Sequence, residues 1–287
     1  MVYLVQKLTK LSLGNATFFT IMILFSTPYF SGVLERGNTI FITVIFLCGA
    51  LYLRENKSIW HRQTALILIA CAAGFKALPC IMGLLYIREK KYREAVHLFI
   101  WGIILCLLPF IFTGGWAGFV EYIKIITNHV GSRPMRWASL PGFVNYWVYF
   151  LRGSLKHMGI PQLILQTIFC CSMIYFSLTT KERWKAVFYL SMIMAYSHSG
   201  SYRYYTAYLT LPLLLLVADR KNFNTADICE KVKLYIYYIL FASVFVIPVW
   251  IINFGDVEHW MCGSAYVLCL YCVGTDIFAS KKSIALE

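Results

Sequence analysis

Four short stretches of this sequence combine cations, polar groups and aromatic rings in a way that suits an anionic substrate. The first is Glu35-Arg36-Gly37-Asn38. Its arginine can bind a phosphate, and its glutamate can act as a base or pair with the arginine. The plainer interpretation is a helix cap, with Asn38 at the N-terminus of a helix and Gly37 in the turn before it. Both interpretations stay open from the sequence.

The second stretch is Lys76-Ala77-Leu78-Pro79, which interrupts a long apolar segment. A lysine at membrane depth is energetically costly, so a functional role is the first hypothesis. The alternative is a structural role, in which Lys76 pairs with backbone carbonyls at a chain reversal and lies short of the outer groups.

The third stretch runs from His198 through Tyr202-Arg203-Tyr204-Tyr205. Arginine can bind a phosphate through two hydrogen bonds, and His198 can serve as a hydrogen-bond donor or an acid. Anchoring at the membrane interface by tyrosines and one extended arginine is the alternative.

The fourth stretch lies in the segment 114–160, which the topology derived below places outside the cytoplasm. Its polar residues are Asn128, His129, Arg133, Arg136, Ser139 and Gly142. Positive charge on the outer side departs from the usual bias, and a lipid-linked phosphate would account for it. Contact with ordinary anionic headgroups is the alternative.

The elements that must position these groups are predicted to be membrane helices. Hydrophobic residues make up 60% of the 287 residues and charged ones 14%, which is about half the share in soluble domains. The apolar runs show no strand-like alternation, and helices satisfy their own backbone groups in lipid. The sequence predicts one all-α domain over residues 1–287, a polytopic transmembrane helical bundle of about eight crossings. These lie roughly at 12–27, 38–53, 95–113, 161–179, 184–199, 204–218, 233–252 and 261–278.

The apolar segment 63–87 decides the topology. If it enters the membrane and returns, 18 of the 26 lysines and arginines lie in cytoplasmic loops and 7 outside, with Lys76 embedded; if it crosses, the split is 11 inside to 14 outside. The positive-inside rule therefore favours a re-entrant hairpin, with arms of about 12 residues that reach partway through the bilayer. Pro79 predicts a break near Ala77 and Leu78. The segment 114–160, rich in aromatic residues at helical spacing, is predicted to form amphipathic helices in the outer interface.

The net charge of +13 would suggest a nucleic-acid partner in a soluble protein. Here the charge lies mostly in short loops between apolar runs, so it indicates topology, and no nucleic-acid partner is predicted.

The order of the motifs resembles a known family. Arg36-Gly37-Asn38 opens a span, and Lys76 with Pro79 precedes a basic turn at 88–93. The stretch 128–142 follows the next span, and Tyr202-Arg203-Tyr204-Tyr205 precedes Leu211-Pro212. Over residues 20–220 this order is similar to the polyprenol-phosphate-sugar-dependent glycosyltransferases of family 87, which have the GT-C membrane fold. A similar Arg-Gly-Asn stretch occurs in the mannosyltransferases of glycolipid-anchor synthesis.

The resemblance implies a multi-pass enzyme of a bacterial inner membrane, with an activity like that of a mannosyltransferase. Its donor would be a polyprenyl-phosphate sugar delivered from the membrane lipid, and its acceptor a glycan or glycolipid on the extracytoplasmic face. No metal or other cofactor is expected. Glu35 is the candidate catalytic base. The candidate substrate-binding residues are Arg36, Asn38, Lys76, His129, Arg133, Arg136, His198, Tyr202 and Arg203.

One departure from the family pattern stands out. The catalytic carboxylate of the family normally lies in an outer loop after the first span, whereas the matched order begins here almost at Met1. The resemblance therefore predicts missing N-terminal spans, which leaves open a fragment, a split protein whose partner subunit supplies them, or an inactive relative.

The rival functions are a polysaccharide polymerase or ligase with a lipid-diphosphate donor, and a transporter or flippase. A transporter would show paired broken helices in two related halves, and only one break is evident.

Overall fold

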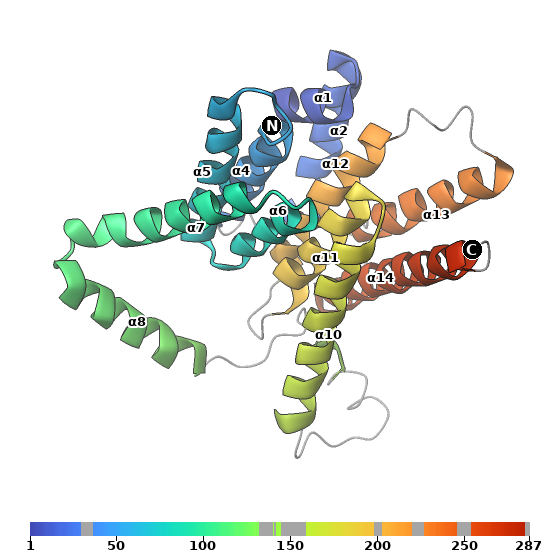
Figure 1. The fold of residues 1–287 in the computed structure, drawn as a ribbon. Coiled ribbons are helices and arrows are strands. Elements are labelled where there is room, and N and C mark those ends of the chain that lie inside the picture. Colours follow the sequence, from blue (N-terminus) through green and yellow to red (C-terminus); the bar gives the residue numbers. More distant parts are fainter. Residues whose placement is uncertain are drawn as a thin grey trace.

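The computed structural model describes residues 1–29, 37–131, 140, 142–144, 159–197, 203–219, 227–245 and 254–284. These residues form helices and connections without a strand, as the apolar runs predicted (Figure 1). The elements are α1 (Val2–Thr9), α2 (Leu13–Leu24), α3 (Thr27–Tyr29), α4 (Ile40–Leu53), α5 (Ile59–Phe75), the 3-10 helix η2 (Leu78–Gly83), α6 (Leu84–Arg88), α7 (Tyr92–Leu107), η3 (Leu108–Ile111), α8 (Gly115–Gly131), α10 (Gly159–Thr179), α11 (Arg183–Tyr196), η4 (Arg203–Leu209), α12 (Thr210–Ala218), α13 (Ile228–Phe245) and α14 (Phe254–Ile284).

Within the described residues, each predicted crossing overlaps one or two of these helices, but the helices differ in length. Among the described residues, two helices are long and apolar enough to cross a membrane. They are Tyr92–Ile111, with a mean hydropathy of 2.1, and Trp260–Ser280, with 1.5. The other apolar helices are shorter, so the number of crossings stays a prediction. The predicted span 204–218 is not one α-helix, because its first part is the 3-10 helix η4.

Helix α11 forms the centre of the bundle. All its residues from Trp184 to Tyr196 are buried, and the helix contacts α10, η2, η4, α12 and α14. An α-helix that is apolar on most sides is covered either by neighbouring elements or by lipid, and α11 is covered by its neighbours. Its position in the middle of Figure 1 agrees with this coverage.

The outside of the bundle is also apolar, most clearly along α7. Phe99 is 70% exposed, and Val96, Ile100, Ile103 and Ile104 are exposed on the same helix. Soluble monomers rarely expose so continuous an apolar face, so this surface favours lipid as its surroundings.

The segment 59–88 folds back on itself. Helix α5 ends at Phe75, Lys76 takes an extended conformation with φ −148° and ψ 118°, and η2 and α6 return. Ion pairs join the two ends: Arg54 pairs with Glu89, and Arg62 lies 3.4 Å from Glu94. The predicted break next to Ala77 is confirmed. The first arm is longer than expected, since 17 residues of α-helix span about 25 Å.

A sharp corner separates α7 from α8, and the two helices form a V in Figure 1. Gly114 and Gly115 have φ values of 90° and 59°, which favour glycine. Across the corner, the ring of Phe110 lies 5.2 Å from that of Phe119 and 5.5 Å from that of Tyr122. The predicted helix at the start of 114–160 is therefore confirmed, and its place in the interface stays a prediction.

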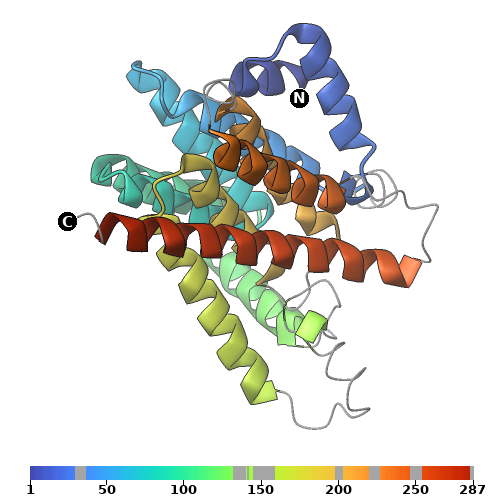
Figure 2. The same ribbon diagram turned by 90° about the vertical axis from the view of Figure 1, so that its right-hand side faces the viewer.

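Helices α13 and α14 pack against each other, and α14 lies across the bundle in Figure 2. A polar cluster binds them to the centre. The ammonium of Lys185 on α11 donates to Asp276 at 2.8 Å and to Thr275 at 3.1 Å, and the hydroxyl of Tyr189 donates to Asp276 at 2.8 Å.

Candidate functional site

The tip of the 59–88 hairpin brings Lys76 against the start of η4. The Lys76 ammonium lies 5.3 Å from the ring centroid of Tyr205 and 5.9 Å from that of Tyr204. The two rings stack on each other, with centroids 4.9 Å apart and planes 30° apart. These distances suit a cation–π interaction. The longer first arm carries the hairpin tip to the third stretch, where Lys76 contacts Tyr204 and Tyr205, and the depth of the tip in the membrane stays a prediction.

Hydrogen bonds fix η4 in this position. The hydroxyl of Tyr29 lies 2.8 Å from that of Thr210 and donates to the carbonyl of Ala207 at 3.3 Å. The hydroxyl of Tyr196, at the end of α11, lies 3.2 Å from that of Thr206. Both tyrosines are buried, so each bond replaces a costly unpaired hydroxyl.

The first stretch adjoins the same 3-10 helix. Tyr29 directly precedes the segment 30–36, and its ring lies edge-on to Phe41 at 6.1 Å. Beyond that segment, Gly37 has φ +58°, and the side-chain oxygen of Asn38 accepts the backbone N–H of Ile40 at 3.1 Å. Asn38 thus accepts a backbone N–H at the start of α4, although the N-cap of the helix is Thr39 rather than Asn38. Glu35 and Arg36 lie outside the described residues, and both flanks of their segment contact η4.

The fourth stretch reaches this end of the bundle through one aromatic contact. The ring of Phe143 lies 4.9 Å from that of Tyr266 on α14, and Tyr266 lies 5.2 Å from Tyr196. Tyr196 in turn bonds to Thr206 of η4. His129 belongs to α8, but its side chain lies outside the description, as do Arg133 and Arg136.

The remaining candidates belong to the third stretch. Arg203 is the first residue of η4, and its side chain lies outside the description. His198 and Tyr202 also lie outside the described residues. Their described neighbours, Ser197 and Tyr204, are both buried.

Sequence reasoning missed three tyrosines of this site. Tyr29 and Tyr196 position η4, as their hydrogen bonds show. Tyr208 is fully buried, its ring lies 6.2 Å from that of Tyr205, and among the described residues its hydroxyl has no hydrogen-bond partner. The recurrence of tyrosine at 204, 205 and 208 was the available signal. Tyr29 and Tyr196 carry no such signal, because their roles depend on packing against residues such as Thr210 and Tyr266, far away in the sequence.

Ion pairs of the described residues gather at the opposite end of the bundle. They join Arg54 and Lys91 to Glu89, Arg62 to Glu94, Arg183 to Glu55, and Lys185 to Glu182 and Asp276. Burial alone would raise the pKa of Glu89, but the charges of Arg54 and Lys91 outweigh it and hold this pKa below its usual value. The end with Lys76 and the end with paired charges are therefore chemically distinct.

Comparison with known proteins identifies the family. The model of glycosyltransferase family 87 matches residues 1–217 of the 287. No curated protein and no solved structure matches the chain. The matched region runs from α1 to α12 and includes Lys76 and η4. Because it covers most of the chain, this protein belongs to glycosyltransferase family 87.

Proposed function

We propose that this chain transfers a sugar, in the manner of a mannosyltransferase, from a polyprenyl-phosphate donor to a glycan or glycolipid acceptor. The reaction takes place on the extracytoplasmic face of a bacterial inner membrane, at the end of the bundle formed by η4 and the hairpin tip. Family membership supplies the class of enzyme, a membrane glycosyltransferase with a sugar donor and a glycan acceptor. The observation that carries the finer proposal is the ammonium of Lys76 on the stacked rings of Tyr204 and Tyr205.

The chemistry calls for cations at this place. The oxygen of the acceptor hydroxyl forms a bond to the anomeric carbon, and the bond from that carbon to the phosphate oxygen breaks. The lipid phosphate leaves with the bonding electrons, and a carboxylate, which we assign to Glu35, takes the hydroxyl proton. Negative charge develops on the leaving oxygen, so positive groups already in position lower the barrier.

Lys76 is suited to this role because the chain reversal and the rings of Tyr204 and Tyr205 hold its ammonium in place. The hairpin reversal fixes its backbone, and the cation–π contacts restrict the ammonium. In this proposal Arg36, His198 and Arg203 add further contacts to the phosphate, since the described residues flanking them meet at η4. Asn38, His129, Arg133, Arg136 and Tyr202 are proposed to contact the donor or the acceptor.

The test is transfer from a radiolabelled polyprenyl-phosphate sugar in membranes that contain the full chain, co-expressed with the products of neighbouring genes. Lys76→Met is expected to lower the transfer rate about 100-fold, the usual effect of removing one group that stabilises developing charge. Lys181→Met is the matched control, because Lys181 is exposed in the connection between α10 and α11, at the end of the bundle with the paired charges. Its rate should equal that of the wild type.

Two results would contradict the proposal. One is an equal rate for Lys76→Met and the wild type at equal protein levels. The other is transfer that requires a lipid-diphosphate donor, which would support a polymerase or ligase instead.

A further inference from the structure

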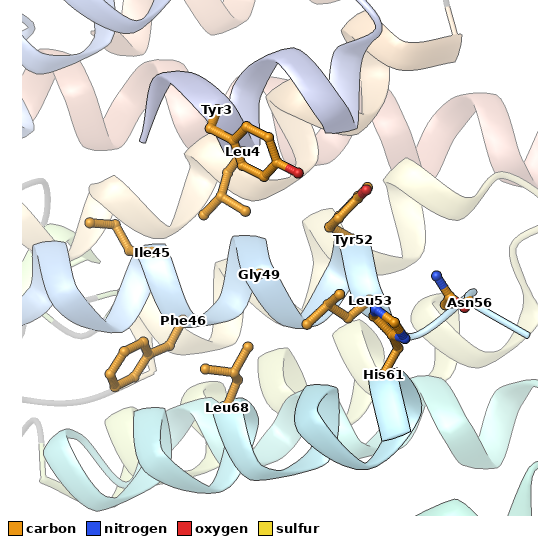
Figure 3. A pocket seen from close by; sticks show the side chains of 10 residues that line it. All are labelled: Tyr3, Leu4, Ile45, Phe46, Gly49, Tyr52, Leu53, Asn56, His61 and Leu68. Atoms are coloured by element: carbon orange, nitrogen blue, oxygen red, sulfur yellow. The ribbon is translucent and has the colours of Figure 1, made fainter. Parts of the chain in front are cut away.

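A groove of about 470 Å³ runs between α1, α4 and α5, away from Lys76 and η4 (Figure 3). One part of it is apolar. Leu4 of α1 lies on one side, Ile45 and Phe46 of α4 lie along it, and Leu68 of α5 lies on the other side. Gly49 has no side chain on the surface of α4 between these apolar residues, and a Cβ at this position would come within 3.1 Å of Leu68. An unbranched hydrocarbon chain suits such a surface.

The other end of the groove is polar. The side chains of Asn56 and His61 line this end, and both offer N–H donors. The ammonium of Lys7 lies 5.4 Å from the ring of Tyr3, which also lines the groove, and the exposed Lys57 follows Asn56 in the chain. The groove-lining residues that the structure describes include no aspartate or glutamate. This end is therefore complementary to an anion.

The groove and the Lys76 site lie at opposite ends of the same helices. The polar end of the groove lies at the connection from Leu53 to Ile59, whereas Lys76 and η4 lie where α4 begins and α5 ends. The 14 residues of α4 separate the two ends by about 21 Å. A headgroup at His61 therefore cannot be the donor phosphate at Lys76.

We propose that this groove binds one glycerophospholipid with an anionic headgroup. Its acyl chain lies along Leu4, Phe46 and Leu68, and its phosphate accepts hydrogen bonds from Asn56 and His61 near the charges of Lys7 and Lys57. The apolar part, the adjoining donors and the ammonium of Lys7 next to Tyr3 together match such an amphiphile, and the volume lies in the ordinary range of ligand pockets. The bound lipid fastens α1 onto α4 and α5. This proposal requires a membrane protein but not the sugar-transfer reaction.

The test uses the full chain, reconstituted with equal amounts of phosphatidylglycerol and phosphatidylcholine and then transferred to mild detergent for native mass spectrometry. The wild type is expected to retain about one phosphatidylglycerol per chain. Leu4→Trp and Ile45→Trp fill the groove from two different helices, and each should abolish retention. Ile103→Trp is the matched control, because Ile103 is exposed on α7, away from the groove. It should retain the lipid.

A second pair of variants tests the headgroup. Removing a cation near a lipid phosphate weakens binding about fivefold, so Lys7→Met should reduce the preference for phosphatidylglycerol by that factor. His61→Ala should weaken retention of either lipid, since it removes a donor to the phosphate shared by both.

Three outcomes would overturn the proposal: retention unchanged in both tryptophan variants while their thermal unfolding matches the wild type, equal retention of the two lipids, or detergent alone in the groove. Each is read from bound lipid, so failure here is distinguishable from a failure of sugar transfer.

Discussion

The ammonium of Lys76 faces two stacked rings, and the negative face of an aromatic ring attracts a cation whether or not the ring carries a hydroxyl. Substitutions of Tyr205 can therefore measure the contribution of the ring and the contribution of the hydroxyl separately. The same residue distinguishes positioning of the lysine from direct hydrogen bonding to a substrate.

Tyr205→Phe keeps the ring and is expected to retain most of the transfer activity, whereas Tyr205→Ala loses it about fivefold, the equivalent of about 1 kcal/mol. The measurement is kcat/KM with the radiolabelled donor. Equal losses in the two variants would show that the hydroxyl, rather than the ring, carries the effect.

Two buried tyrosines near η4 differ in one respect. The hydroxyl of Tyr196 bonds to Thr206, and that of Tyr208 has no partner among the described residues. We expect Tyr196→Phe to lower the free energy of unfolding by about 1 kcal/mol and Tyr208→Phe to leave it unchanged or slightly higher. Thermal unfolding of the purified variants in detergent checks this. A larger loss for Tyr208→Phe would mean that its hydroxyl is bonded in the native protein.

At the scale of elements, the 59–88 hairpin depends on the ion pairs that join its ends. The Arg54 side chain is 2% exposed, so removing its partner leaves a buried charge without compensation. Glu89→Gln should therefore lower the free energy of unfolding by about 3 kcal/mol. Glu94→Gln is the matched control, because its pair with Arg62 is longer and more exposed and contributes about 0.5 kcal/mol. Similar losses in both variants would contradict a special role for Glu89.

The effect of Glu89 depends on pH. Its pKa is lower in the folded chain than in the unfolded one, so its stabilising contribution is complete above the unfolded value of about 4.3. That contribution disappears as the pH falls through the lowered pKa. The Tm difference between the wild type and Glu89→Gln should therefore shrink on acidification below about pH 4. A difference that stays constant across this range would exclude the proposed ion pair.

Sequence patterns predicted the helices and the position of the chain reversal, because apolar runs and Pro79 are local signals. They did not predict the depth of the hairpin tip. That depth depends on how α5 packs against α4, as in the contact between Phe46 and Phe75, whose rings lie 6.0 Å apart. The 3-10 form of η4 was also missed, since the apolar composition of 204–218 suits either helix type.

At the scale of the whole molecule, the described flanks of the four stretches meet around η4. The meeting is produced by Tyr29, Tyr196 and the contact between Phe143 and Tyr266. Tyr29 and Thr210 lie far apart in the sequence, as do Phe143 and Tyr266, so no local spacing indicates these two contacts. The separation of paired charges from the Lys76 end likewise follows from the fold.

The ion pair between the two ends of the hairpin also predicts on which side of the membrane its flanking connections lie. Because Arg54 and Glu89 are joined, the connections at Lys57 and Lys90 must lie on one side of the membrane. Epitope tags inserted after these residues should both be inaccessible to antibody in intact spheroplasts and accessible after permeabilisation. A tag after Gly153 is the control, predicted to be accessible in both. Labelling of only one of the first two tags would contradict the hairpin.

The most direct test of the central claim is photocrosslinking with a polyprenyl-phosphate sugar that carries a diazirine next to the phosphate. The sites are then located by peptide mass spectrometry of the full chain. We expect labelled peptides that contain Lys76 and Tyr204–Tyr205, and a loss of this labelling in Lys76→Met but not in Lys181→Met. Labelling confined to the groove between α1, α4 and α5, or unchanged in Lys76→Met, would contradict the claim that the donor phosphate binds at η4.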